Sequence, residues 1–281
     1  MPSPLRSIGS KKRLIQKHDL MKYFPRCVTY KHWNEEHTRM INHRRVYVEL
    51  FCGSAITFFN LDPTPTFVIL NDINHDIFNF WNVIATQYDD FIKELKYTWI
   101  GQDWLDKYEA RTDDVSRAIA FYIRNRRENI IDVPMDFPKE PKFEQWKAIM
   151  DRSRLKIWNL DYKDAMAKLN KMTFKKNDNC MEFLLFEDPP YAGQERFYGT
   201  DFNEKDHEIL ANLNHESTHD IIITYGDNEY IRELYSDWYI VELKNYTTMK
   251  WKYNTELLLS NHPLTKRDEI KNKKGTDMKL F

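Results

Sequence analysis

The stretch that decides the fold reads Phe183-Leu184-Leu185-Phe186-Glu187-Asp188-Pro189-Pro190-Tyr191. Its first four residues are all apolar, which is typical of a strand covered by helices on both faces. An acid, two prolines and an aromatic residue then follow almost at once. Because open α/β sheets bind their ligands beyond the carboxyl ends of the strands, we expect these last side chains at a functional site.

The segment Asp188–Tyr191 carries groups that suit a flat, amino-bearing ring. Two prolines fix the backbone and remove two N–H donors, which leaves carbonyl oxygens free to accept hydrogen bonds. A carboxylate beside such a carbonyl can accept both protons of a planar amino group. Tyr191 offers an aromatic face on which a base can stack. The plain alternative is a Pro-Pro turn after a strand, with an incidental acid.

Similar apolar runs recur along the chain and alternate with helical patterns. Strands alternating with helices predict right-handed crossovers and a mostly parallel sheet of the α/β class. The expected helices include one around Ala55–Asn60 and others over Ile77–Ala85, Asn203–Asn214 and Glu229–Tyr235. We therefore predict a seven-stranded, Rossmann-like sheet. Its strands are Val46–Phe51, Phe67–Leu70, Leu155–Trp158, Phe183–Phe186, Ile221–Thr224, Tyr239–Leu243 and Glu256–Ser260.

Acids and small residues follow three other predicted strands at the same edge. Glu49 precedes a turn in which Gly53 and two small residues permit a ligand to approach the backbone, although Gly53 could simply relieve strain there. Asp72 ends the second strand, where an acid is well placed to accept hydrogen bonds from ribose hydroxyls. Asp161 follows the third strand, with helix capping as an equal alternative to ligand contact. Four acids around one crevice together indicate a binding site.

One region interrupts the alternation of strands and helices. Residues 97–154 show helical patterns over Asp103–Arg111 and Asp114–Arg127 and a proline-containing loop, without a clear strand. We expect a smaller, mainly helical insert between two parts of a catalytic domain, 1–96 and 155–262, with a polar tail at 263–281. The basic run Arg124–Arg127 and the basic stretch Lys139–Lys156 make the insert a candidate for phosphate contacts, although either could be a solvated helix face.

Composition excludes several classes of protein. The chain has 42 basic and 43 acidic residues among 281, so any nucleic-acid surface must be a local one. It has no phosphate-loop or dinucleotide fingerprint and no apolar run long enough to cross a membrane. Three cysteines without Cys-x-x-Cys spacing argue against a disulfide framework or a cysteine zinc site. We expect a cytoplasmic protein that needs no metal.

Taken together, these segments resemble the Dam-type class of adenine-specific DNA methyltransferases, which use S-adenosylmethionine. Val48–Ala55 is similar to the loop that receives the donor's methionine part, although Ser54 and Ala55 stand where the family often has glycine. Leu70–Asn74 resembles the segment that follows, and Asp188–Tyr191 resembles the catalytic tetrapeptide. Ile8–Leu14 is similar to an N-terminal segment that closes over the donor. The order of these segments is that of the family's alpha arrangement.

The resemblance implies a role for each matching residue. S-adenosylmethionine would be the methyl donor, and double-stranded DNA the partner. Asp188 and the Pro189 carbonyl would hold the target amino group, with Pro190 completing the turn and Tyr191 stacked on the target base. The DNA-binding residues would be Arg124, Asn125, Arg126 and Arg127. The donor-binding residues would be Gly9, Lys11, Glu49, Phe51, Gly53, Asp72 at the ribose and Asp161 at the adenine.

Three other functions share parts of this pattern. A protein glutamine methyltransferase would carry Asn in place of Asp188 and would lack the insert. An RNA adenine methyltransferase is chemically close. A non-catalytic DNA-binding protein with a decayed site would have lost Asp188 or the donor loop, and both are intact.

Overall fold

We describe the protein from a computed structural model that covers residues 3–5, 11–25, 29–33, 40–98, 101–127, 143–172, 174–176, 179–197, 201–247 and 252–264. The described residues form one nine-stranded sheet. Seven strands follow one another across it in the order β4-β3-β2-β6-β7-β9-β8, with β1 on β2 and β5 on β6. The strands are β1 (Thr29–Trp33), β2 (Met40–Glu49), β3 (Phe67–Asn71), β4 (Arg154–Trp158), β5 (Phe174–Lys176), β6 (Asn179–Glu187), β7 (Asp220–Gly226), β8 (Tyr239–Thr247) and β9 (Lys252–Ser260).

The predicted seven-stranded, mostly parallel sheet is confirmed. Strands β4, β3, β2, β6 and β7 run parallel to one another, while β9 pairs antiparallel with both β7 and β8. The sequence analysis missed β1, β5 and the first half of β2. In β1 and the start of β2 polar residues outnumber apolar ones, so no apolar run marks these strands.

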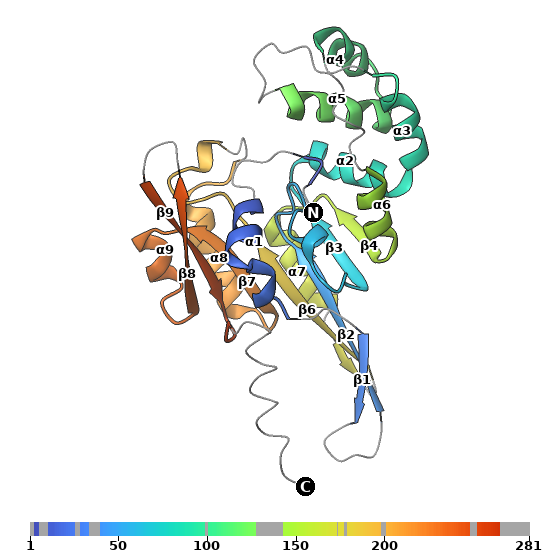
Figure 1. The fold of residues 1–281 in the computed structure, drawn as a ribbon. Coiled ribbons are helices and arrows are strands. Elements are labelled where there is room, and N and C mark those ends of the chain that lie inside the picture. The colour runs from blue at the N-terminus through green and yellow to red at the C-terminus, as the bar shows by residue number, and fades with distance from the viewer. Residues whose placement is uncertain are drawn as a thin grey trace.

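Strict alternation along the central strands divides the core into two layers. On β2, Tyr47 faces one layer and Val48 the other, and on β6 Leu184 and Leu185 divide in the same way. Helices α1, α2 and α6 lie on the first face, with α3, α4 and α5 packed beyond α2, and α7, α8 and α9 cover the second face (Figure 1). The helices are α1 (Lys12–His18), α2 (His75–Thr86), α3 (Tyr88–Leu95), α4 (Gln102–Glu109), α5 (Asp114–Arg127), α6 (Phe143–Asp151), α7 (Tyr162–Met172), α8 (Glu204–Glu216) and α9 (Glu229–Leu234), with 3-10 turns η1 (Leu20–Tyr23), η2 (Phe58–Asn60) and η3 (Glu195–Phe197).

In the 97–154 region, the described residues form helices α4, α5 and α6 before β4 begins at Arg154, and α5 and α6 pack on α2. Figure 1 shows α3, α4 and α5 grouped beside α2 at one end of the molecule. Phe80 of α2 contacts Phe91 of α3 and Tyr122 of α5, and Phe143 of α6 contacts the last two rings. These helices therefore share the hydrophobic layer on the first face of the sheet. The boundaries of the insert stay a prediction.

The helix expected around Ala55–Asn60 is wrong, because only the 3-10 turn η2 forms there. Ala55 has a φ of 49°, in the left-handed region that interrupts a right-handed helix. The sequence also did not reveal α1, α3 and α6. Among the described residues, none of the helices is both long enough and apolar enough to cross a membrane.

Candidate active site

One cavity of about 830 Å³ lies at the carboxyl ends of β2, β3, β4 and β6. Asp188 and Gly53, which the sequence analysis placed on one crevice, both line it. The parallel strands bring their ends to the same edge of the sheet, although the residues are far apart in sequence. The predicted catalytic and donor-binding residues that line the cavity are Lys11, Glu49, Phe51, Gly53, Asp72, Asp161, Asp188 and Pro190.

Glu49 holds the loop that follows β2. Its Oε1 accepts hydrogen bonds from the Tyr47 hydroxyl at 2.9 Å and from the Phe58 backbone N–H at 2.6 Å. Burial raises the pKa of Glu49 to about 8, in spite of these two donors. Burial therefore favours the neutral acid at pH 7, and a cation bound beside Glu49 would favour the carboxylate instead.

Gly53 and Asp72 join the ends of β2 and β3. Gly53 has a φ of 46°, a left-handed conformation that glycine adopts without strain. Its N–H donates to Asp72 Oδ2 at 2.8 Å, and the Asn74 N–H donates to Oδ1 at 2.9 Å. Burial raises the pKa of Asp72 to about 6, while both hydrogen bonds oppose the shift. Asp72 is thus mainly a carboxylate at pH 7, and its position is fixed by the backbone.

Asn71, which was not predicted from the sequence as a site residue, links the ends of three strands by hydrogen bonds. Its Nδ2 donates to the carbonyls of Leu50 and Leu160, at 3.0 Å each, and its Oδ1 accepts the Leu160 N–H at 3.1 Å. Asn159 adds hydrogen bonds to the carbonyls of Asp72 and Ile73. A buried amide that spans β2, β3 and the end of β4 keeps this edge rigid. Its only signal in the sequence is an Asn directly before the candidate Asp.

Three aromatic rings from separate elements form one wall of the cavity. Phe51 follows β2, Tyr162 begins α7, and Phe202 precedes α8. Their ring centroids lie 5.7 to 6.0 Å apart. Asp161, the residue before Tyr162, accepts the Lys163 N–H at 2.9 Å and so caps α7. The sequence analysis missed Tyr162 and Phe202 because neither follows a strand directly.

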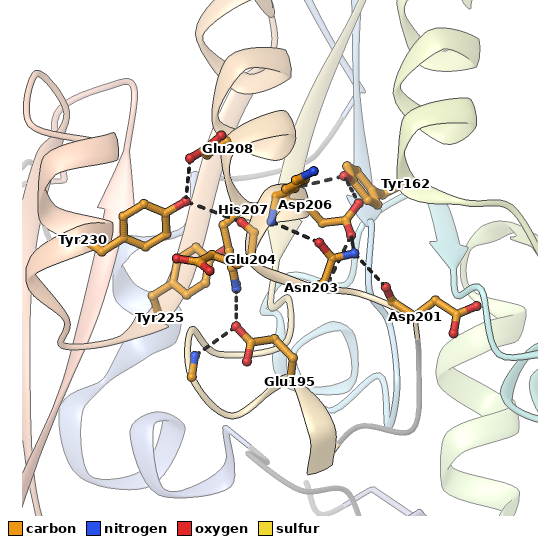
Figure 2. A network of polar contacts seen from close by, with 12 residues as sticks. Tyr162, Glu195, Asp201, Asn203, Glu204, Asp206, His207, Glu208, Tyr225 and Tyr230 are labelled. Atoms are coloured by element: carbon orange, nitrogen blue, oxygen red, sulfur yellow. Dashed lines mark hydrogen bonds and ion pairs between the residues drawn. The ribbon is translucent and has the colours of Figure 1, made fainter.

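A polar network supports this wall from the N-terminus of α8 (Figure 2). Asp206 accepts hydrogen bonds from the Tyr162 hydroxyl and the Lys163 ammonium, at 2.9 Å each, and from Asn203. Burial opposes the ionisation of Asp206, but these donors outweigh it and lower its pKa. Burial and the Asp206 contact both raise the pKa of Tyr162. The ring of Tyr162 is therefore held by a fixed carboxylate.

The other half of the network anchors the chain after the tetrapeptide. The ring of His207 on α8 is fully buried and lies between the Tyr225 hydroxyl, 2.8 Å from Nδ1, and Glu195 Oε1, 3.0 Å from Nε2 (Figure 2). Glu195 also accepts the Gly193 N–H at 2.9 Å. The loop after Tyr191 is thereby tied to α8 and β7.

Asp188 lies at the end of β6, beside Lys11. Its Oδ1 is 2.7 Å from Lys11 Nζ and accepts a hydrogen bond from Thr224 Oγ1 at 3.0 Å. Burial raises the pKa of Asp188, and the Lys11 ammonium opposes that rise. Pro190 lines the cavity, whereas Pro189 is buried beside it. An acceptor carboxylate thus faces the same space as the donor loop.

Tyr191 is turned away from the cavity wall. Tyr191 is only 9% exposed to solvent. Its ring packs against Gly226, where an added Cβ would lie 3.0 Å from the ring. Its hydroxyl accepts from Lys11 Nζ at 2.5 Å and donates to Glu256 Oε2 at 2.8 Å. In this conformation the ring face predicted to stack on a base is covered.

The family described as D12 class N6 adenine-specific DNA methyltransferase matches residues 9–254 of this chain. The chain belongs to this family. The resemblance stated from the sequence is thereby confirmed. The prediction that the protein is an adenine-specific DNA methyltransferase is confirmed with it. Neither the RNA methyltransferase nor the non-catalytic alternative is favoured.

Bacterial relatives of this D12-class methyltransferase carry the name "DNA adenine methylase". The protein from Serratia marcescens is 27% identical over 224 residues, which cover 68% of this chain and 77% of that one. The proteins from Vibrio cholerae and Haemophilus influenzae are each 23% identical, with 79% and 75% of their lengths covered. A solved methyltransferase from Pyrococcus furiosus matches 89% of this chain and 83% of its own at 13% identity, with a TM-score of 0.33 that is too low to bear on the fold.

In this methyltransferase the predicted DNA-binding residues of α5 lie beside the cavity. Arg124 and Asn125 line it. Arg124 pairs with Asp76 at 2.9 Å and with Glu109 at 3.7 Å. Arg126 donates to the Pro4 carbonyl at 2.8 Å. Both arginines therefore also tie α5 to neighbouring segments.

Several predicted positions lie outside the described residues. They are Gly9, the side chain of Arg127, and residues 128–142 with Lys139 and Lys142. Within the described part of the chain, no cluster of three His, Cys, Asp or Glu side chains could hold a metal ion.

Proposed function

We propose that this methyltransferase extrudes an adenine from double-stranded DNA and transfers a methyl group from S-adenosylmethionine to its exocyclic amino group. One observation carries the proposal: Asp188, Gly53 and Asp72 border a single cavity. An acceptor for an amino group and the predicted donor loop thus face the same space. The tetrapeptide alone could be an incidental turn, but a turn would not require this arrangement.

The donor half of the cavity would be formed by the strand ends of β2 and β3. Asp72 is held by two backbone N–H groups and suits the hydroxyls of a ribose. The wall of Phe51, Tyr162 and Phe202 offers flat faces for the donor's adenine. Lys11, Glu49 and Gly53 remain for the methionine portion, together with Gly9. We assign Asp161 to the adenine amino group, in addition to its capping contact.

The target half would be formed by Asp188 and its neighbours. A carboxylate at Asp188 and the carbonyl of Pro189 can each accept one N–H of an exocyclic amino group. These two acceptors would orient the nitrogen and keep its lone pair available. The bound donor supplies an activated methyl group on a cationic sulfur. The protein's own contribution is then positioning and electrostatics rather than covalent catalysis.

Base extrusion follows from where the acceptor lies. The amino group of a paired adenine is engaged inside the duplex, so it must leave the stack at a cost of a few kcal/mol. Tyr191 would offset part of this cost if its ring turns toward the base, which requires it to leave its place on Gly226. Arg124, Asn125 and Arg126 would contact the DNA near the mouth of the cavity, with Arg127 beside them.

The proposal is tested by methyl transfer with labelled S-adenosylmethionine. The substrates are double-stranded DNA without adenine methylation and single-stranded RNA of matched sequence. We expect label in adenine of the DNA and little in the RNA. Asp188→Ala should lower the rate by about a hundredfold or more, because the amino group loses its charged acceptor. Asp237→Ala, at an acid that is 69% exposed, is the matched control.

Sequencing of modified adenines in cells that express the protein gives the second readout. A new mark should occur at one sequence context with the wild type and disappear with Asp188→Ala. Binding of S-adenosylhomocysteine to both proteins checks that the donor half is intact. If the wild type binds this ligand but leaves no mark on DNA, the proposed activity is wrong.

A further inference from the structure

Glu256 lies beside the target half of the site, in contact with Lys11 and Tyr191, although the sequence offers no signal for it. It stands on β9 opposite Gly226, the last residue of β7. Because β9 runs antiparallel to β7, its first half reaches the same edge of the sheet as the carboxyl ends of the parallel strands. This topology brings a carboxylate from near the end of the chain next to Lys11 and Tyr191.

Lys11 stands between two carboxylates. Its ammonium is 2.7 Å from Asp188 Oδ1 and 3.5 Å from Glu256 Oε2, and its side chain is 2% exposed. A buried ammonium is destabilised unless an anion stays next to it. Either carboxylate could therefore be its main partner, and in this conformation the shorter contact goes to Asp188.

The target amino group would compete with this ammonium. Asp188 Oδ1 already accepts from Thr224 in addition to Lys11. An adenine amino group that uses the same carboxylate needs the Lys11 contact to weaken. Glu256 is close enough for the ammonium to shift toward it without leaving the buried site.

Before Tyr191 turns toward a base, its hydroxyl holds Glu256 next to Lys11. It donates to Glu256 Oε2 at 2.8 Å and accepts from Lys11 at 2.5 Å, so it links both partners of the shift. Among the described residues, Asp188 interacts electrostatically with Lys11 before α1, with Glu256 on β9 and with the titratable side chain of Glu49 on β2.

We propose that Glu256 is a positioning residue that takes over the Lys11 ammonium when the target amino group engages Asp188. The inference rests on the proposed function, because it concerns the same amino group. Without the charge of Glu256, Lys11 would stay on Asp188 and compete with the base. The donor contacts assigned to Asp72 and to the wall of Phe51, Tyr162 and Phe202 would be unaffected.

Glu256→Gln tests this with little change in shape. Glutamine can still accept the Tyr191 hydroxyl, so the variant removes the charge and keeps the contact. Glu242→Gln, on the neighbouring strand β8, is the matched control, because Glu242 is 44% exposed and pairs with Arg232. Rates are measured with labelled S-adenosylmethionine at saturation on unmethylated double-stranded DNA, from pH 5 to 9. Melting curves and binding of S-adenosylhomocysteine monitor folding.

We expect Glu256→Gln to lower the rate by about tenfold and to change binding of S-adenosylhomocysteine much less, because the contacts assigned to its ribose and adenine do not involve Lys11. The rate falls at low pH as Asp188 is protonated, and we call this part of the pH profile the acid limb. In Glu256→Gln the acid limb should move to lower pH, because the negative charge of Glu256 contributes to the raised pKa of Asp188. Glu256→Asp, which keeps the charge, should keep the limb at the wild-type pH and recover part of the rate. It also provides the comparison if the glutamine variant does not fold.

Two outcomes would overturn the inference. In the first, Glu256→Gln matches Glu242→Gln in both rate and acid limb. In the second, the Gln and Asp variants lose rate equally and neither limb moves, which would indicate a packing role. An inactive wild type would instead contradict the proposed function, so the two failures can be told apart.

Discussion

Glu187, the residue before Asp188, should make the stability of the protein fall as pH rises. Its side chain is fully buried in the second layer of the core, and Asn214 Nδ2 donates to its Oε2 at 2.8 Å. Among the described residues, Glu187 Oε1 and Asn214 Oδ1 have no hydrogen-bond partner. Both atoms can only accept hydrogen bonds while Glu187 is charged, so these two buried acceptors lack a donor. A neutral Glu187 supplies it.

The magnitude follows from the pKa. Burial raises the pKa of Glu187 from 4.5 to about 8, against the opposing Asn214 contact. Between these values the folded protein keeps a proton that the unfolded chain releases, so the free energy of unfolding falls with rising pH. Each pH unit is worth about 1.4 kcal/mol, so by pH 8 the loss is of the order of 5 kcal/mol. Below pH 4.5 this loss is absent.

Glu187→Gln removes the titrating group and keeps an amide that can pair with Asn214. Urea unfolding at several pH values from 5 to 8.5 should therefore show the variant gaining stability relative to the wild type across this range. The contribution of Glu49, also buried with a pKa of about 8, is common to both proteins and cancels. Glu216→Gln, at an exposed position on α8, should run parallel to the wild type. Parallel curves for Glu187→Gln as well would refute a neutral, buried acid.

Three further predictions concern the site. Asp72→Asn should weaken binding of S-adenosylhomocysteine, and the loss of affinity as pH falls through about 6, the raised pKa of Asp72, should be larger in the wild type than in the variant; calorimetric titration at pH 5.5 and 7.5 tests both. Gly226→Ala should slow methyl transfer by about tenfold with little change in binding of the same ligand, because its Cβ would press on the Tyr191 ring and shift the hydroxyl that holds Glu256 beside Lys11; a wild-type rate would show that this position does not matter. Alanine at Arg124, Arg126 and Arg127 together should weaken DNA binding and flatten its salt dependence in filter binding, and unchanged affinity would remove the α5 assignment.

The central sheet was predictable because its signal is local. The buried strands Phe67–Leu70, Phe183–Phe186 and Ile221–Thr224 are apolar at every position or end in one Thr, and each lies where the sequence analysis expected it. The strand β1 and the helix α6 were not predicted, since the first is largely polar and the second adjoins a proline-containing loop. A segment with few apolar residues gives a weak local signal, and the contacts it makes in the folded protein decide its structure.

The helix predicted after Gly53 shows how tertiary contacts override local preference. Ala55 is a good helix former, but the loop it lies in is fastened by the bond from Phe58 to Glu49 and by that from Gly53 to Asp72. These bonds hold the chain in an irregular turn and leave only η2 as a helical segment. Asp72 is too far along the chain from Ala55 for a short sequence window to include both.

The sequence by itself determined where seven strands lie along the chain, which acids and glycine stand at their ends, and the family to which the chain belongs. These are properties of short segments, in which apolar runs and turn residues act on their immediate neighbours. Only the tertiary structure brought Lys11, Thr224 and Glu256 to Asp188 and stacked Phe51, Tyr162 and Phe202 into one wall. The physical reason is that these partners come from different strands and helices, and their distances are set by sheet order and by the antiparallel direction of β9.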